Sequence, residues 1–238
     1  MYLIVFMEKK KIIKELNQEF NNCEPKKILE FCINNLFKKK IVYVCSFGTE
    51  SAIILDLISK IDPTLPIVLL NTHFLFEETL EYRKQLINIF KLENCTEILP
   101  DLNDLKKNDK KNDLWKTDPE KCCEIRKVLP LEKELMKYDA WISGRKSYHG
   151  AERENLKVFE YQNEKVVVNP IIFMKEERIK NYFIQEKIPR HPLYLKGYLS
   201  IGCTNCTAKT LNNKDIRSGR WVNSSKTECG IHKFGKES

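Results

Sequence analysis

Two pairs of cysteines and one isolated cysteine are the residues of this chain best suited to chemistry. Cys122 and Cys123 are adjacent, Cys203 and Cys206 are separated by two residues, and Cys229 lies late in the sequence. Adjacent Cα atoms are about 3.8 Å apart, below the roughly 4.4 Å that an unstrained disulfide needs, so metal ligation is the better use of the first pair. The two pairs then supply four thiolates, and Cys229 remains as a separate reactive thiol.

Four thiolates suit either zinc or a 4Fe–4S cluster. Structural zinc usually takes two spaced pairs, whereas one pair here is adjacent and neither pair has a histidine beside it. The spacing therefore favours an iron–sulfur cluster, although only modestly. The alternative is that these cysteines are ordinary buried thiols, which free cysteines often are.

A polar loop between a predicted strand and a predicted helix is a second candidate site. Its residues are Ser46, Phe47, Gly48, Thr49, Glu50 and Ser51. At such a junction, backbone N–H groups and the helix dipole can hold an anion, and the three hydroxyl side chains can donate further hydrogen bonds. The loop is not a Walker A motif, because no Gly-Lys-Ser/Thr follows it. On this feature alone, a phosphate site and an ordinary turn both stay open.

The composition narrows the class of protein. At 238 residues the chain can form one large domain or two small ones, and nothing in its composition indicates two. A net charge of +8 implies an anionic partner. The lysines are scattered, however, and no stretch interleaves aromatic with basic residues as a base-stacking surface would, so we expect no nucleic acid.

The cysteine content and the apolar runs bear on location. Nine cysteines are better explained by a reducing cytosol, as ligands, a nucleophile and core residues, than by a disulfide scaffold. No apolar stretch approaches the roughly 18 residues that span a membrane, and no signal peptide is recognisable. We therefore expect a cytoplasmic protein that does not bind a membrane.

The hydrophobic pattern predicts alternating strands and helices. Short apolar runs rich in β-branched residues predict strands, and apolar residues at helical spacing predict helices. The predicted strands are residues 41–45, 67–70, 95–99, 140–143 and 166–170, and the predicted helices are residues 52–61, 77–90, 122–138 and 175–186, preceded by two helices within residues 9–37. Residues 101–118 are polar and are predicted to form a loop. This alternation predicts an α/β fold with a mostly parallel sheet and helices on both faces.

Seven segments between residues 46 and 232 match the motifs of one family, in family order. They are SFGTES, LNTHFLFEETLEYR, CCEIRKVLPL, WISGRKSYHGAER, PRHPLYLKGYLSIGCTNCT, DIRSGRW and KTECGIH. Through them the chain resembles the assimilatory adenylylsulfate reductases, the iron–sulfur branch of the phosphoadenylylsulfate reductase family. The resemblance covers nearly the whole chain, and the late motifs are highly specific. It implies a Rossmann-like fold of the adenine nucleotide alpha hydrolase type, with one reductase domain over residues 1–220 and a mobile catalytic tail over residues 221–238.

The resemblance also assigns roles to individual residues. It implies a 4Fe–4S cluster held by Cys122, Cys123, Cys203 and Cys206, with Cys229 as the nucleophile. The implied substrate contacts are the loop residues Ser46, Phe47, Gly48, Thr49, Glu50 and Ser51, together with Lys127, Gly144, Arg145, Arg217, Arg220 and His232.

The implied activity is the thioredoxin-dependent reduction of adenylylsulfate to sulfite and AMP in sulfate assimilation. The Cys229 thiolate attacks the sulfur and expels AMP, which leaves an S-sulfocysteine, and reduced thioredoxin or glutaredoxin then releases sulfite. The sulfate oxygens repel a thiolate, so fixed cations are needed. Arg217 and Arg220 are spaced to face the same way on a helical turn and can grip oxyanions bidentately.

The segment around Cys229 is expected to move. Cys229 must meet first a nucleotide and then a protein dithiol, and the polar residues 223–225 together with Gly230 and Gly235 make a lid-like segment reasonable.

Three alternatives to this activity stay open. The substrate could be the 3′-phosphorylated nucleotide, or the enzyme could accept both forms. An ATP pyrophosphatase of tRNA modification shares the nucleotide loop and can carry a cluster, but would not require KTECGIH. A non-catalytic iron–sulfur sensor would leave Arg217, Arg220 and Cys229 without a task. The family includes homo-oligomers, so self-association is open as well.

Two features depart from the family pattern or carry no assigned chemistry. Asn71 stands where the family usually has Asp, which puts its nucleotide contact in doubt. His73, His149 and His191 are expected to be structural or surface residues.

Overall fold

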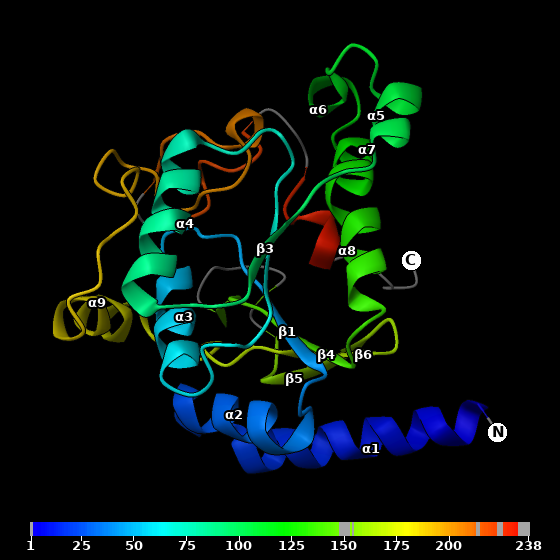
Figure 1. The fold of residues 1–238 in the computed structure, drawn as a ribbon, viewed down its shortest axis with the longest axis vertical. Coiled ribbons are helices and arrows are strands. Elements are labelled where there is room, and N and C mark those ends of the chain that lie inside the picture. The colour runs from blue at the N-terminus through cyan, green and yellow to red at the C-terminus, as the bar shows by residue number, and fades with distance from the viewer. Residues whose placement is uncertain (1, 148–152, 154, 213–214, 223–225, 233–238) are drawn as a thin grey trace.

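A six-stranded sheet forms the centre of the part of the chain that the structure describes (Figure 1). The structure is a computed structural model that describes residues 2–147, 153, 155–212, 215–222 and 226–232, with only the backbone described for residues 2–9. The strands are β1 (Ile41–Val44), β2 (Ile67–Leu70), β3 (Cys95–Ile98), β4 (Ala140–Ile142), β5 (Phe159–Gln162) and β6 (Lys165–Val168), in the spatial order β3-β2-β1-β4-β6-β5.

All strand pairings are parallel except that of β5 with β6. The five parallel strands are those that the sequence predicted, whereas β5 was missed. Two of its four side chains, Glu160 and Gln162, are polar, so no continuous apolar run marks the strand. A two-residue turn then leads from β5 into β6. Strand β5 lies at the edge of the sheet, where one-sided burial is sufficient.

The central parallel strands β1, β2 and β4 read as continuous apolar runs because both of their faces are buried. Tyr43 and Ile142 belong to a large core on one face, whereas the intervening Val42 and Trp141 belong to a smaller core on the other. This alternation follows from the two-residue period of a strand. The larger core is covered by α1 (Tyr2–Phe20), α2 (Pro25–Phe31), α3 (Ser51–Ser59), α4 (Glu77–Phe90) and α9 (Glu176–Gln185).

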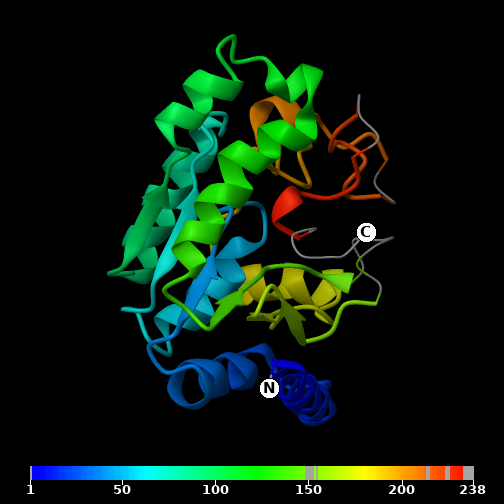
Figure 2. The same cartoon turned by 90° about the vertical axis from the view of Figure 1, so that its right-hand side faces the viewer.

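The smaller core is covered by α8 (Leu129–Leu135), which lies in front of the central strands in Figure 2. Leu131 and Leu135 of α8 share this core with Val42, Trp141 and Val167. Helices therefore lie on both faces, and the predicted α/β fold with a mostly parallel sheet is confirmed. A π-helical turn (Cys32–Leu36) follows α2, and short 3-10 helices cover Thr204–Cys206 and Gly230–His232.

The prediction of a loop at residues 101–118 is wrong, because these residues form α5 (Leu102–Asn108) and α6 (Leu114–Thr117). Caps stabilise these short helices where an apolar stripe is missing. The Asp101 carboxylate accepts hydrogen bonds from the N–H groups of Asn103 and Asp104 at 2.7 and 3.2 Å. The buried Asp109 carboxylate likewise accepts from the backbone of Asp113 and Leu114.

The predicted helix at residues 122–138 is continuous but not uniform. It comprises α7 (Pro119–Cys123), a π-helical turn (Glu124–Val128) and α8. Pro130 has no N–H to donate, and its ring would clash with the carbonyl of Arg126 in a regular α-helix. The widened turn, in which the Leu129 N–H reaches the carbonyl of Glu124, accommodates this proline.

The strand order creates a switch point between β1 and β4, because the chain builds outward from β1 in one direction and from β4 in the other. In open parallel sheets, ligands bind beyond the carboxyl ends of the strands at such a point. Residues 46–51 follow β1 and residues 143–146 follow β4, so both segments lie at this edge. Over the described residues, no helix has the length and apolarity needed to span a membrane.

Candidate active site

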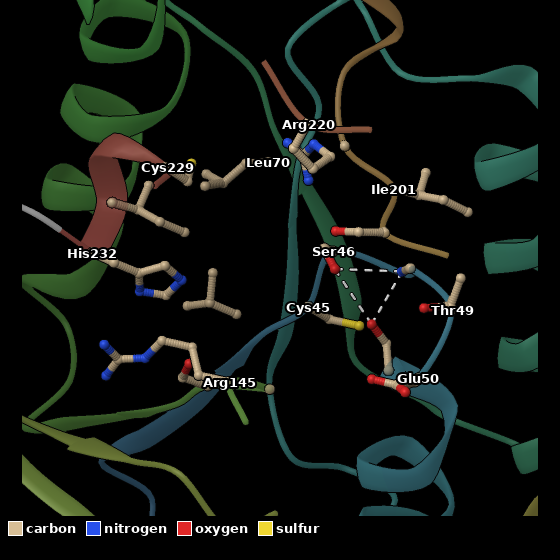
Figure 3. A pocket seen from close by; sticks show the side chains of 18 of the residues that line it. Cys45, Ser46, Thr49, Glu50, Leu70, Arg145, Ile201, Arg220, Cys229 and His232 are labelled. Carbon is tan, nitrogen blue, oxygen red and sulfur yellow. Dashed lines mark hydrogen bonds between the residues drawn. The ribbon is translucent and has the colours of Figure 1, made fainter. Parts of the chain in front are cut away.

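The loop at residues 46–51 connects β1 to the first turn of α3 and is held by its own hydroxyl groups. The Gly48 N–H donates to Ser51 Oγ at 3.1 Å, and Ser46 Oγ lies 3.4 Å from Ser51 Oγ (Figure 3). Thr49 Oγ1 donates to the carbonyl of Leu199 at 3.2 Å, which ties the loop to the segment opposite. The loop thus opens at a helix N-terminus, where an anion is favoured.

Phe47 differs from the other loop residues. It has a left-handed backbone with φ of 48°, and its side chain is fully buried in the larger core. It is not among the residues that line the pocket beside the loop. The Phe47 side chain therefore does not face this pocket, and the expected substrate contact of Phe47 stays a prediction. Burial of the ring fixes the turn on which the neighbouring residues are presented.

One pocket at the switch point gathers every other predicted substrate contact together with Cys229 (Figure 3). The predicted residues around it are Ser46, Gly48, Thr49, Glu50, Ser51, Lys127, Gly144, Arg145, Arg217, Arg220, Cys229 and His232. The loop at residues 46–51 lies on one side, and Cys229 and His232 lie on the other (Figure 3). Segments from both ends of the chain therefore share one cavity.

The pocket is strongly basic. Six Lys and Arg side chains but only two carboxylates, those of Glu50 and Glu228, are among its described lining residues. Lys146 forms a buried ion pair with Glu50, and Arg145 forms one with Glu160. Lys127 and Arg220 form no ion pair with any residue that the structure describes. A polyanionic ligand would find uncompensated positive charge there.

Arg217 and Arg220 lie on a turn and not on the helical turn that their spacing suggested. Both guanidinium groups nevertheless lie over the ring of Trp221, at 5.3 and 4.3 Å from its centroid. Burial lowers the pKa of Arg217 to about 10. The aromatic platform thus presents the two cations side by side, as predicted, by a different local structure.

Arg220 is also held by the loop that carries Cys203 and Cys206. Its Nε donates to the carbonyl of Cys206 at 3.2 Å. A Cβ atom at Gly202 would lie 2.3 Å from Arg220 Nη2, so only glycine leaves room for the guanidinium. The position of Arg220 therefore depends on the cysteine loop.

Cys229 rests between a lysine and one of the paired cysteines. Its Sγ lies 3.8 Å from Lys127 Nζ. The pKa of Cys229 is held well below its usual value, first by a hydrogen bond from Cys123 and then, against burial, by the charges of Lys127 and Arg220. The two cations would act whether or not Cys123 binds a metal. They favour the thiolate, which is the nucleophilic form of cysteine.

His232 closes the same side of the pocket. Its ring stacks on Trp141, with centroids 5.7 Å apart and planes 13° apart. Burial and the neighbouring charge of Arg145 lower its pKa, so the ring is neutral. Its Nδ1 is buried and finds no hydrogen-bond partner among the described residues. A bound ligand could supply that partner.

The four paired cysteines line a second, smaller pocket next to the first. Cys122 and Cys123 come from α7. Cys203 precedes the 3-10 turn that Cys206 ends, and this turn is fixed by a bond from the Thr204 N–H to the carbonyl of Phe74 at 2.7 Å. Within the described residues, no three metal-binding side chains converge closely enough to hold a single ion. A cluster binds each thiolate through a different iron atom and so needs wider spacing. An all-thiolate donor set around one pocket fits that group.

Burial favours the protonated form of two of these thiols, Cys122 and Cys206, in the absence of a metal. It raises the pKa of Cys122 to about 11 and also raises the pKa of Cys206. Deprotonation therefore needs a bound cation, which is the usual link between ligation and pKa. Lys127 lines both pockets.

The comparisons with known proteins agree with this arrangement. A model described as the phosphoadenosine phosphosulfate reductase domain matches residues 40–209. The chain belongs to this family. A protein of Mesorhizobium japonicum named adenosine 5′-phosphosulfate reductase is 38% identical over 222 residues, which cover 93% of this chain and 87% of that protein. One of Halalkalibacterium halodurans with the same name is 34% identical, covering 92% of this chain and 96% of that protein.

A solved structure supports the phosphoadenosine phosphosulfate reductase fold. The phosphoadenylyl-sulfate reductase of Candida auris, in complex with phosphate, superposes with a TM-score of 0.70 at 22% identity, covering 82% of this chain and 96% of that one. At this identity the likeness establishes the fold. The predicted family membership is thereby confirmed by sequence, and the predicted architecture by structure.

In this member of the phosphoadenosine phosphosulfate reductase family, three pocket residues were missed from sequence. Arg153 and Glu228 form a buried ion pair at 2.7 Å, and Lys146 pairs with Glu50. Arg153 ends the matched segment WISGRKSYHGAER, and Glu228 adjoins Cys229. Both residues lie in or beside motifs that the sequence analysis had already selected, so their positions could have marked them as candidates. Their pairing could not be predicted, because it joins segments that are distant in the sequence.

The tail that carries Cys229 lies on α7 and on the π-helical turn after it. Lys226 forms an ion pair with Glu120 of α7. A Cβ atom at Gly230 would lie 3.2 Å from Val128 Cγ2, so the tail approaches the turn closely at this glycine. Residues 223–225 and Gly235, on which the predicted mobility of the tail partly rested, lie outside the described residues.

Asn71 does not line the nucleotide pocket. Its amide donates to Glu97 at 2.8 Å and accepts the His73 N–H at 3.1 Å. His73 is exposed, and His191 is buried in the fold, in keeping with the structural or surface roles expected. His149 lies outside the described residues.

Proposed function

We propose that this chain reduces adenylylsulfate to sulfite and AMP, with electrons from a dithiol protein of the thioredoxin or glutaredoxin type. The observation that carries the proposal is Cys229, a thiol 3.8 Å from the Lys127 ammonium, facing the same basic pocket as the loop at residues 46–51. Curated relatives that match nine-tenths of the chain are named adenosine 5′-phosphosulfate reductase, which supports this choice of substrate.

The pocket suits the two ends of this substrate. The loop at residues 46–51 would hold the α-phosphate through backbone N–H groups and hydroxyls at the start of α3. The sulfate end would lie toward Lys127, Arg217 and Arg220, whose charges offset the repulsion between its oxygens and an incoming thiolate.

In the first step, the Cys229 thiolate attacks the sulfur of adenylylsulfate. An S–S bond forms, the S–O bond to the phosphate breaks, and AMP leaves with that electron pair. The product on the enzyme is an S-sulfocysteine at Cys229. Lys127 and Arg220 stabilise the thiolate before the attack.

In the second step, a thiolate of the reduced partner attacks Cys229 Sγ and expels sulfite, which leaves a mixed disulfide. The second thiol of the partner then displaces Cys229 as a thiolate. The partner becomes a disulfide, and its two electrons account for the reduction of sulfate sulfur to sulfite. Cys229 must be reachable by a protein in this step, so the tail must leave the pocket.

We further propose that Cys122, Cys123, Cys203 and Cys206 hold a 4Fe–4S cluster. All four line one pocket, and their chemistry suits iron. The cluster would supply structure and electrostatics beside Lys127. A cytoplasmic location and self-association stay predictions from the sequence.

The test is sulfite release by anaerobically purified protein given reduced thioredoxin and either adenylylsulfate or its 3′-phosphorylated form. We expect sulfite from the wild type and a loss of at least about 1,000-fold in Cys229→Ser, because the nucleophile is removed. Cys23→Ser, a partly exposed thiol between α1 and α2, is the matched control and should keep full activity.

Substrate alone should add one sulfonate mass to the peptide that contains Cys229. Sulfite from neither nucleotide would instead favour an ATP pyrophosphatase or a sensor. Equal rates in Cys229→Ser and wild type would remove this thiol from the mechanism.

A further inference from the structure

One carboxylate occupies the centre of the cation cluster. Glu228 Oε2 accepts from Arg153 Nε at 2.7 Å, and Oε1 accepts from Arg153 Nη2 at 2.9 Å. Oε1 also accepts from Arg217 Nη2 at 3.1 Å and from the Cys229 N–H at 2.9 Å. These are the contacts that a bound oxyanion would make: a bidentate guanidinium fork, a second guanidinium and a backbone N–H.

The environment confirms that the carboxylate is held as an anion. Its side chain is only 7% exposed, and both arginines are largely buried. Burial alone would raise the pKa of Glu228, but the hydrogen bonds and charge of Arg153 outweigh burial and hold the pKa well below its usual value. Among the described residues, the carboxylate that neutralises both of these buried guanidinium groups is Glu228.

The space left in the pocket is small. With the tail in this position, the cavity measures about 190 Å³. Pockets that enclose ligands of drug size usually measure about 300–1,000 Å³. A nucleotide with a phosphosulfate group thus needs the tail to shift, and Glu228 and Cys229 must shift together because they are adjacent.

We propose that Glu228 is an internal stand-in for the sulfonucleotide's anionic group: it neutralises Arg153 and Arg217 while the tail is closed and yields them when substrate binds. This inference rests on the proposed function for the identity of the ligand. Glu228 acts through the tail and the arginines, so it is a positioning residue. Both arginines are then paired with an anion in the closed state and in the substrate-bound state. This lowers the free energy needed to move the tail.

Binding measures the competition directly. Adenylylsulfate would be titrated calorimetrically into iron-loaded Cys229→Ser and Cys229→Ser/Glu228→Gln, since neither can turn it over. Because the neutral amide no longer competes for the arginines, we expect the affinity to rise at least about tenfold. Glu186→Gln, the same change at an exposed ion pair just after α9, should leave the affinity unchanged.

An unchanged or weaker affinity in the Glu228→Gln background would overturn the proposal. Glu228→Asp in the same background keeps the charge and should bind adenylylsulfate with nearly the affinity of the Cys229→Ser parent. This variant, together with melting temperatures measured with and without nucleotide, excludes a general folding defect. Glu228→Gln should also gain more melting temperature from the nucleotide than the parent does, because the ligand neutralises arginines that the variant leaves unpaired.

The rate of alkylation of Cys229 tests, without any nucleotide, whether Glu228 holds the tail in the closed position. We expect iodoacetamide to alkylate the Cys229 peptide faster in Glu228→Gln than in wild type by about tenfold, and at the wild-type rate in Glu186→Gln. Equal alkylation rates in all three proteins would contradict the role of Glu228 in holding the tail closed. If no variant bound adenylylsulfate, the proposed function would fail, whereas the alkylation rates would still decide the role of Glu228.

Discussion

Arg220 lies so close to Gly202 that a larger residue at position 202 must displace it. A Cβ atom at this position would be 2.3 Å from Arg220 Nη2 and 2.7 Å from its Cζ. We expect Gly202→Ala to raise the KM for adenylylsulfate about tenfold, corresponding to roughly 1.4 kcal/mol, because one cation of the pocket loses its position. Steady-state kinetics with reduced thioredoxin would measure the effect.

A double-mutant cycle separates this route from a general defect of the cysteine loop. If Gly202→Ala acts through the guanidinium, it should add little in an Arg220→Ala background. Full additivity of the two effects, or a loss of bound iron in Gly202→Ala, would show that the alanine disturbs the loop itself.

Residue types and spacing were enough to find the cysteines, the loop at residues 46–51 and the late arginines, because each belongs to a local pattern. They were not enough for Glu228 and Arg153, which meet only in the folded chain. Phe47 shows the opposite limit. Phe47 belongs to the loop at residues 46–51, but its left-handed backbone directs the ring into the core. The spacing of apolar residues does not predict such a backbone conformation.

His191 joins the segment before the cysteine loop to α4. Its Nδ1 accepts the Leu193 N–H at 3.1 Å, which leaves Nε2 protonated and bonded to Thr79 Oγ1 at 3.1 Å. The edge of its ring also meets Tyr82. A second proton would break the bond to Leu193, and the ring is fully buried.

This arrangement predicts acid sensitivity. Burial lowers the pKa of His191 from 6.5 to about 4, against a smaller effect of Glu78 in the other direction. The stabilisation is complete above pH 6.5 and is lost as the pH falls, because the unfolded chain takes up the proton first. Between pH 7.5 and pH 5 we expect a loss of about 2 kcal/mol in the free energy of unfolding.

Urea unfolding at the two pH values, for wild type and His191→Gln, measures this loss. The variant should be less stable at pH 7.5 and should lose less on acidification than the wild type, since carboxylates contribute equally to both. Equal losses in the two proteins would show that His191 does not titrate in this range.

The elements that the sequence failed to predict are those that caps and edges stabilise. Strand β5 is marked by no apolar run, but Asn17 of α1 closes its outer edge, accepting the Phe159 N–H at 3.0 Å and donating to its carbonyl at 2.8 Å. Helix α5 depends on Asp101. Such side-chain-to-backbone bonds are specific to the folded structure, whereas the buried parallel strands are recognisable from their composition.

The whole molecule places two pockets at the same edge of the sheet with Lys127 between them. One pocket collects the loops after β1 and β4, and the other collects the four cysteines. Burial would lower the pKa of Lys127, but the negative charges of the cysteine thiolates around it outweigh burial and raise the pKa, so the ammonium group keeps its proton. A charge placed in either pocket therefore acts on this ammonium group.

We expect adenylylsulfate to perturb the visible absorbance of the iron-loaded protein, because the nucleotide draws on the same cation that faces the cysteines. Lys127→Met should bind iron but lose most of this perturbation at saturating nucleotide. The matched control is Lys60→Met at the C-terminal cap of α3, which lies outside both pockets and should behave as wild type. An equal perturbation in Lys127→Met would refute coupling through this residue.

The loop that carries Cys203 and Cys206 is held against the segment after β2 by two backbone contacts. These are an antiparallel β-bridge between Leu75 and Cys203 and the hydrogen bond from the Thr204 N–H to the carbonyl of Phe74. All six strands of the described sheet are complete by Val168, well before either of these cysteines is reached. During synthesis, the sheet can therefore form before two of the four proposed cluster ligands, Cys203 and Cys206, have been made. If the four cysteines hold iron as proposed, it can be inserted only after this late segment has returned to the edge of the sheet that the early strands form.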